Sequence, residues 1–205
     1  MRRGKELRNR ILFSAKELFL ELGFERASMD EIAARAGTTK RSLYAHFENK
    51  EKLFLAMIDL LGDLLGGKLE DPSDYAADPI DCLVLFYARF HNVLQWGPAV
   101  RMCRLFIAEA ERFPAGAARA YEAIFGTVQK RTEDFLRTRL GRSRKSSARM
   151  ADQLMGIVLR PRVIRALFGI DPVSEQWRDE ADPSFHRAPL RQIITQIIAR
   201  DQGDA

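Results

Sequence analysis

Residues 40–47 bring together side chains that could read DNA. If they form a helix with Leu43 and Phe47 on its buried side, Arg41 and Ala45 point outward. An arginine can bond both major-groove acceptors of guanine, and a small residue such as alanine allows close approach to the bases. Flanking groups suit phosphate oxygens: Ser42, Tyr44, His46 and Lys50. The pattern indicates a major-groove helix, although an ordinary solvent-exposed helix could carry the same residues.

Catalytic chemistry has few candidates in this sequence. Of the three histidines, His46 belongs to the outward face just described and His186 to a polar segment. Only His91 could pair with Glu109 as an acid–base or metal site, and a lone histidine on an apolar helix is more often a core residue. HExxH, P-loop and GxSxG motifs are absent. We therefore expect no catalytic residues, no bound metal and no cofactor.

The residues around 40–47 fit into a helix-turn-helix, which would position their outward face. Gly23 should cap a first helix, and Ser28 with Glu31 forms a capping box that starts a second. That helix should stop at Gly37, after which Thr39 can cap the helix ending at Phe47. A turn of about three residues containing glycine between two helices is typical of the helix-turn-helix. A fourth helix, capped by Asn49, should end near residues 66–67.

Residues 28–50 (SMDEIAARAGTTKRSLYAHFENK) closely resemble the DNA-binding signature of the TetR family of bacterial transcription regulators, and the resemblance extends over residues 7–58. It implies that the following positions face the bases or the groove: Thr38, Thr39, Lys40, Arg41, Ser42 and Ala45. It implies that others hold the DNA backbone: Ser28, Tyr44, His46 and Lys50. Many members carry glycine at the position of Arg41, so the family's base preference does not transfer to this chain.

A second and less specific resemblance lies further along the chain. RLFIAEAERFP at residues 104–114 is similar to the C-terminal region of the AefR-like branch of that family. In that branch the C-terminal helices dimerise and enclose an effector pocket. Pro161 departs from the pattern expected in the next-to-last helix, which it should kink or split.

Charge is concentrated at the N-terminal end. Residues 1–50 hold eleven Lys and Arg against seven Asp and Glu, whereas the rest of the chain is nearly neutral. Such an excess favours a polyanionic partner, here double-stranded DNA. A nonspecific DNA-coating or architectural protein would share this feature, but it would leave a large, apolar second domain unexplained.

The 205 residues, 46% of them apolar, are enough for a substantial core. Strand patterns are scarce, so we expect an all-α fold. It would comprise an N-terminal three-helix helix-turn-helix DNA-binding domain (1–50) and a C-terminal helical ligand-binding and dimerisation domain (51–205). Further helices are expected from Pro79 to Trp96, from residue 98 to about 113, onward to about 140, over 147–168, and from Pro189.

Aromatic, methionine and polar side chains gather on the helices of the second domain. They could fill a core, or they could line a cavity for a small apolar or aromatic effector. The second interpretation, which the resemblance favours, assigns ligand contacts to Phe86, Phe90, His91, Trp96, Met102, Phe106, Tyr121 and Phe125.

The last helix carries an apolar stripe. Such a stripe is too apolar to remain in water, and a homodimer built on this helix and the one around residues 147–168 would cover it. The stripe consists of Leu190, Ile193, Ile194, Ile197 and Ile198. A two-fold dimer in turn predicts a pseudo-palindromic operator.

Two further expectations concern the cell compartment. Cys82 and Cys103 fall within apolar helical patterns and should be free, buried thiols. The longest apolar run, residues 82–88, is far shorter than the roughly 18–20 residues of a membrane span. We therefore expect a cytoplasmic protein with no membrane partner.

Overall fold

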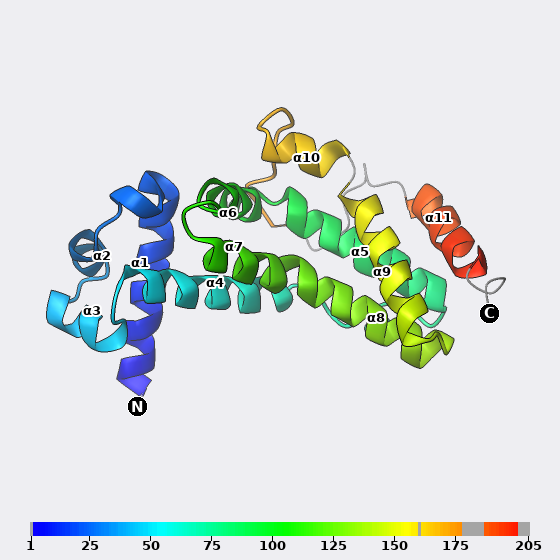
Figure 1. Cartoon of the computed structure of the whole chain (residues 1–205), viewed down its shortest axis with the longest axis horizontal. Coiled ribbons are helices and arrows are strands. Elements are labelled where there is room, and N and C mark those ends of the chain that lie inside the picture. Colours follow the sequence, from blue (N-terminus) through cyan, green and yellow to red (C-terminus); the bar gives the residue numbers. More distant parts are fainter. Residues whose placement is uncertain (1, 160, 178–186, 201–205) are drawn as a thin grey trace. The chain divides into compact units, whose positions relative to one another are not determined.

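The computed structural model describes residues 2–159, 161–177 and 187–200 (Figure 1). Over these ranges the chain forms helices joined by turns, with one isolated β-bridge between Trp96 and Ser174 and no strand. The predicted all-α class is confirmed. The chain packs as two units: residues up to Leu64 with Arg101–Ala123, and Leu65–Val100 with the chain from Ile124 onward. The functional boundary between residues 50 and 51 lies inside the first unit and stays a prediction.

The first unit contains the helices of the expected helix-turn-helix domain, which are α1 (Arg2–Arg26), α2 (Met29–Arg35) and α3 (Lys40–His46). It also contains nearly all of α4 (Lys50–Gly66), most of α6 (Gly97–Ala108) and α7 (Pro114–Tyr121). The helical path of α1 breaks at Gly23, whose φ of 78° suits a residue without a Cβ. Gly37, with φ 61°, makes the turn after α2 in the same way.

A phenylalanine cluster joins these helices. The ring centroid of Phe54 on α4 lies 5.0–6.0 Å from four others, which come from α1, α6 and the residue before α7. These are the rings of Phe19, Phe24, Phe106 and Phe113. Burial of so much aromatic surface, with edge-to-face contacts, makes the first unit one packed body.

The second unit is a helical bundle around α5. Its elements are η1 (Pro72–Asp74), α5 (Pro79–Gln95), α8 (Thr127–Leu140), α9 (Arg144–Val158), α10 (Pro161–Leu167) and α11 (Arg187–Arg200). Eleven consecutive or near-consecutive positions between Cys82 and Leu94 are buried, because α5 packs against η1, α8, α9, α10 and α11. Helices α8 and α9 run side by side (Figure 1).

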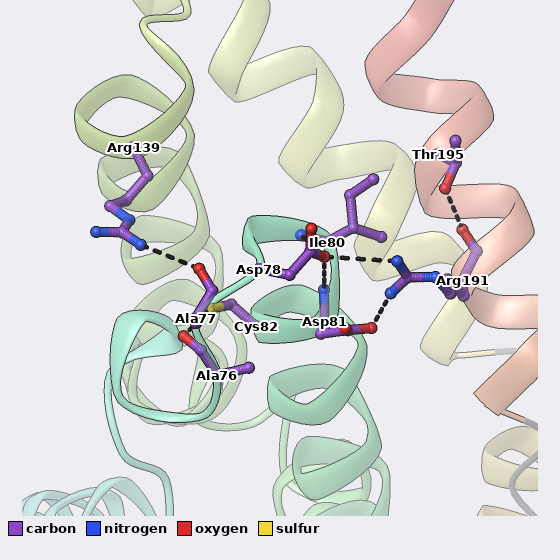
Figure 2. Close-up of polar contacts among 9 residues, drawn as sticks. All are labelled: Ala76, Ala77, Asp78, Ile80, Asp81, Cys82, Arg139, Arg191 and Thr195. Carbon is purple, nitrogen blue, oxygen red and sulfur yellow. Dashed lines mark hydrogen bonds and ion pairs between the residues drawn. The ribbon is translucent and has the colours of Figure 1, made fainter.

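The beginning of α5 anchors α11 through charges. Asp78 caps α5 by accepting from the amides of Ile80 and Asp81, and Pro79 occupies the first helical position as expected. Arg191 of α11 forms ion pairs with Asp78, at 3.6 Å, and with Asp81 (Figure 2). On the other side of this turn, Arg139 of α8 donates to the carbonyl of Ala77 at 3.4 Å.

The structure corrects three of the predicted helices. The helix from residue 98 ends at Ala108 rather than near 113, because residues 109–112 turn and the amide of Phe113 bonds the carbonyl of Glu109. The helix expected to run on to residue 140 is interrupted by a π-helical turn, η2 (Glu122–Gly126). Helix α9 begins at Arg144, three residues before the predicted start, because Ser143 caps it.

Two other expectations are confirmed. The predicted helix over 147–168 is split, with α9 ending at Val158 and α10 beginning at Pro161. Cys82 and Cys103 are buried free thiols, and burial raises the pKa of the Cys103 thiol to about 11. In the part of the chain that the structure describes, none of the helices combines the length and apolar character needed to cross a membrane.

Candidate nucleic-acid interface

Helix α3 divides into a buried and an exposed face as its spacing predicts. Leu43 and Phe47 are buried, at 0% and 4% exposure. Arg41, Tyr44 and Ala45 are exposed. Among the described residues, Arg41 takes part in no ion pair, so its guanidinium donors are available to an external acceptor. This face therefore offers an arginine fork beside a small residue on a rigid helix.

The start of α3 is held by its own side chains. The Thr39 hydroxyl accepts from the amide of Ser42 at 3.1 Å and donates to the Ser42 hydroxyl at 2.9 Å. Thr38 and Ser42 are half-buried and Thr39 is exposed. Thr39 and Ser42, assigned to the groove by resemblance, thus also form the cap that orients α3.

Helix α2 begins with the predicted capping box. The Ser28 hydroxyl accepts from the Glu31 amide at 3.2 Å and donates to the Glu31 carboxylate at 2.7 Å, while the Ser28 amide donates to that carboxylate at 3.1 Å. These hydrogen bonds from Ser28 hold the pKa of Glu31 below its ordinary value. In this structure Ser28 is thus engaged within the protein.

Two ion pairs fix α2 against its neighbours. Arg35 binds Glu21 of α1 through two bonds of 2.8 Å, which raises the pKa of Arg35 and lowers that of Glu21. Lys40 of α3 pairs with Asp30 of α2 at 2.9 Å, and this bond raises the pKa of Lys40. The charge of Lys40, unlike that of Arg41, is thus already matched by a carboxylate.

Lys50 lies between α4 and the end of α1. Its ammonium donates to the carbonyls of Glu25 and Ala27 at 3.0 and 3.1 Å and lies 4.6 Å from the ring centroid of Phe24. An ammonium has three donors, so these bonds leave one for a phosphate. His46, at the end of α3, is half-buried, with its ring 6.3 Å from that of Phe47.

Known protein families match both parts of the chain. Residues 11–57 match the family described as "Bacterial regulatory proteins, tetR family". Residues 81–182 match "AefR-like transcriptional repressor, C-terminal domain". The chain belongs to the TetR family. Its second part is an AefR-like C-terminal domain, as the resemblance at residues 104–114 implied.

Curated relatives match part of the chain. The transcriptional activator FasR of Mycolicibacterium smegmatis is 45% identical over 62 residues, which cover 28% of each chain. The repressor BepR of Brucella suis is 42% identical over 62 residues, 28% of this chain and 30% of its own. TtgR of Pseudomonas putida is 34% identical over 94 residues, 44% of each. The matched segments thus span less than half of these relatives.

Solved structures share the whole fold. A TetR-family regulator from Mesorhizobium loti superposes with a TM-score of 0.74 at 22% identity, covering 98% of this chain and 97% of its own. The flavonoid-responsive regulator FrrA gives a TM-score of 0.73 at 24% identity, with the same coverage. The TetR-like fold, with an N-terminal helix-turn-helix and a C-terminal helical domain, is therefore confirmed.

The predicted effector residues are distributed over both units. In the second unit Phe86, Phe90 and His91 are buried, Trp96 and Phe125 are half-buried, and the ring of Phe90 lies 6.0 Å from that of Phe125. In the first unit three further residues have different environments: Met102 and Phe106 are buried, and Tyr121 is 53% exposed. Their role in ligand binding stays a prediction.

Glu109, which the sequence offered as a partner for His91, has a structural contact in the first unit. Its carboxylate accepts from the amide of Phe24 at 3.3 Å, next to the break at Gly23, and lies 3.9 Å from Arg112. Within the described ranges, no group of three or more metal-ligating side chains occurs. The bond between Glu109 and the Phe24 amide could not be predicted from the sequence, because the two residues are 85 positions apart.

The apolar stripe of α11 is largely covered within one chain. Leu190, Ile194 and Ile198 are buried, and α11 packs on α5 and α9. Ile193 and Ile197 are half-buried. Leu190, Ile194 and Ile198 therefore need no second copy to cover them, contrary to the prediction. Dimerisation through the remaining face of α11 stays a prediction.

Proposed function

We propose that this chain is a sequence-specific DNA-binding transcription regulator, a ligand-released repressor that binds a palindromic operator as a homodimer. The observation that carries the proposal is the exposed Arg41, without an ion pair among the described residues, on a helix whose opposite face is fully packed. The AefR-like repressor domain that follows supports the direction of regulation. A regulator of bacterial genes works in the cytoplasm.

Recognition is divided between two sets of residues. Arg41 reads a base edge, and Ala45 beside it lets α3 approach closely. Thr38, Thr39 and Ser42 line the entry to the groove, and Lys40 exchanges its bond to Asp30 for the DNA. Phosphates are bound by the remaining donors around this face, which come from Ser28, Tyr44, His46 and Lys50.

Release by a small molecule requires that the effector prefer the form that does not bind DNA. The effector is an apolar or aromatic compound held by the aromatic residues of the C-terminal helices. For a tenfold loss of operator affinity, its preference between the two forms must amount to about 1.4 kcal/mol. Two of these aromatic residues are Phe90 and Phe106. Substitution of either one should change the response to the ligand.

Selection of bound sequences from a random DNA pool tests the proposal. A regulator enriches a consensus with two-fold symmetry, because its two recognition helices bind two half-sites. A DNA-coating protein enriches none, and its affinity depends steeply on salt for every sequence alike. The second result would overturn the proposed function.

A further inference from the structure

Arg8 of α1 lies beside the end of α3, although it is not among the residues that the sequence assigned to DNA. Its guanidinium carbon lies 5.2 Å from the ring centroid of Phe47, the residue that caps the end of α3. Arg8 is exposed, whereas Phe47 is buried. The aromatic ring therefore restrains a guanidinium group that solvent can still reach.

The hydrogen-bond donors of Arg8 have no protein partner among the described residues. Within these ranges its side chain forms neither a hydrogen bond nor an ion pair. Glu48 follows Phe47 in the sequence, but in this part of the chain it is exposed and does not pair with Arg8. A guanidinium has five N–H donors, and contact with a ring face occupies none of them. Arg8 thus combines a restrained position with donors that an external acceptor can use.

The end of α3 also carries side chains that the resemblance assigned to the DNA backbone. His46 directly precedes Phe47, and its ring lies 6.3 Å from the Phe47 ring. Arg8 and His46 therefore contact the same phenylalanine, one from α1 and the other from α3. Tyr44, on the last turn of α3, is exposed. Since arginine is a common donor to phosphate oxygens, Arg8 fits the same role as these neighbours.

The side of α1 that carries Arg8 holds a second cation. Lys5 is exposed and lies three positions before Arg8, so the two charges share one side of the helix. The first turn of α1 contains no acidic residue. Arg10 is also exposed, but it lies about 200° around the helix from Arg8. The side that faces the end of α3 is therefore the one on which a polyanion would meet both Lys5 and Arg8.

We propose that Arg8, held against the ring of Phe47, binds a phosphate of the DNA backbone. This inference rests on the proposed DNA binding and adds α1 to the segments that contact the duplex. A guanidinium can bond two phosphate oxygens at once. The contact adds affinity for every DNA sequence and carries no base preference. If Arg8 only offset the negative end of the α3 dipole, its removal would lower stability without changing how salt affects DNA binding.

The salt dependence of DNA binding measures this contact. Arg8→Gln should make the slope of log affinity against log salt concentration shallower by about 0.9, the contribution of one phosphate contact on duplex DNA. The change should be the same on the selected consensus and on a random-sequence duplex. Arg8→Lys keeps the positive charge and should keep most of the slope. Arg10→Gln, which removes an exposed charge from the other side of α1, is the control and should retain the wild-type slope.

Fluorescence anisotropy titrations at several salt concentrations give these slopes, and circular dichroism with urea unfolding shows that each variant is folded. A wild-type slope in Arg8→Gln, with or without a loss of stability, would overturn the proposal. An equal change in Arg10→Gln would also overturn it, since any exposed charge on α1 would then have the same effect. Either result leaves the proposed function standing if wild type still selects a palindrome. A wild type that binds no duplex would contradict both.

Discussion

Lys40 and Arg41 are neighbours on α3 but have different partners. Lys40 is paired with Asp30, whereas Arg41 is exposed without an ion pair among the described residues. Spacing alone predicted that Arg41 points outward, since Leu43 and Phe47 had to face the core. It could not predict the Lys40–Asp30 bond, because opposite charges ten residues apart meet only once the turn at Gly37 is formed.

The contrast between these neighbours predicts different effects on DNA binding. Arg41→Ala should weaken binding to the selected consensus by about 1–3 kcal/mol and relax preference at one base pair of each half-site. Lys40→Ala, the matched control, should reduce affinity for consensus and random duplexes by a similar factor. Titration of both duplexes by fluorescence anisotropy measures these ratios. A wild-type ratio in Arg41→Ala would exclude base reading by this residue.

Lys50 was predicted to contact phosphate, and in the structure it also makes contacts within the protein. Its bonds to the carbonyls of Glu25 and Ala27 and its contact with Phe24 hold α4 against the end of α1. Lys50→Ala should therefore weaken all DNA sequences equally and also lower the free energy of unfolding by about 1–3 kcal/mol. Urea unfolding monitored by circular dichroism checks the second effect. Unchanged stability would show that these contacts contribute nothing to the fold.

At the level of helices, the sequence predicts the boundaries that strong local signals set. The caps at Ser28, Thr39 and Asp78 follow from local residue types, and all three are present. The early end of α6 and the π-helical turn η2 were missed, since they depend on packing between distant segments. At η2, α4 packs so closely that a Cβ at Gly62 would lie 2.7 Å from the Cβ of Ala123.

The capping box gives a pH-dependent prediction. The pKa of Glu31 is lowered in the folded state, so its contribution to stability is present above its unfolded pKa and is lost as pH falls through the folded pKa. Ser28→Ala should destabilise the protein by about 1 kcal/mol near neutral pH. The difference in stability between wild type and Ser28→Ala should become smaller in acid, where the protonated Glu31 side chain no longer accepts the Ser28 hydrogen bonds as a carboxylate. Thermal unfolding across pH checks it, with the exposed Ser73→Ala as control; a difference independent of pH would contradict it.

Glu109 connects the segment after α6 to the bend in α1. Its side chain is only 13% exposed and accepts from the Phe24 amide. Glu109→Ala should lower the free energy of unfolding by about 1–3 kcal/mol, because it leaves a partly buried donor without its partner. Glu109→Gln, which keeps an acceptor oxygen, should lose less. The exposed Glu111→Ala is the control, and equal unfolding midpoints in urea for Glu109→Ala and Glu111→Ala would remove this role.

At the scale of the whole molecule, the proposed homodimer depends on the face of α11 that one chain leaves partly open. Ile197→Asp should shift the protein to monomer while each chain stays folded, because Ile197 is only half-buried within the chain. Ile194→Asp should instead unfold the second unit, since Ile194 is fully buried. Sedimentation velocity with circular dichroism distinguishes these outcomes. A wild type that is monomeric at micromolar concentration would contradict the dimer.

The proposed function requires that α3 read a two-fold symmetric DNA sequence through Arg41. The most direct test is a paired selection from one random DNA pool, performed in parallel with wild type and Arg41→Ala. We predict a palindromic consensus for wild type, and for the variant the same palindrome with preference lost at one symmetry-related pair of positions. Identical consensus sequences for both proteins, or no consensus for wild type, would contradict it.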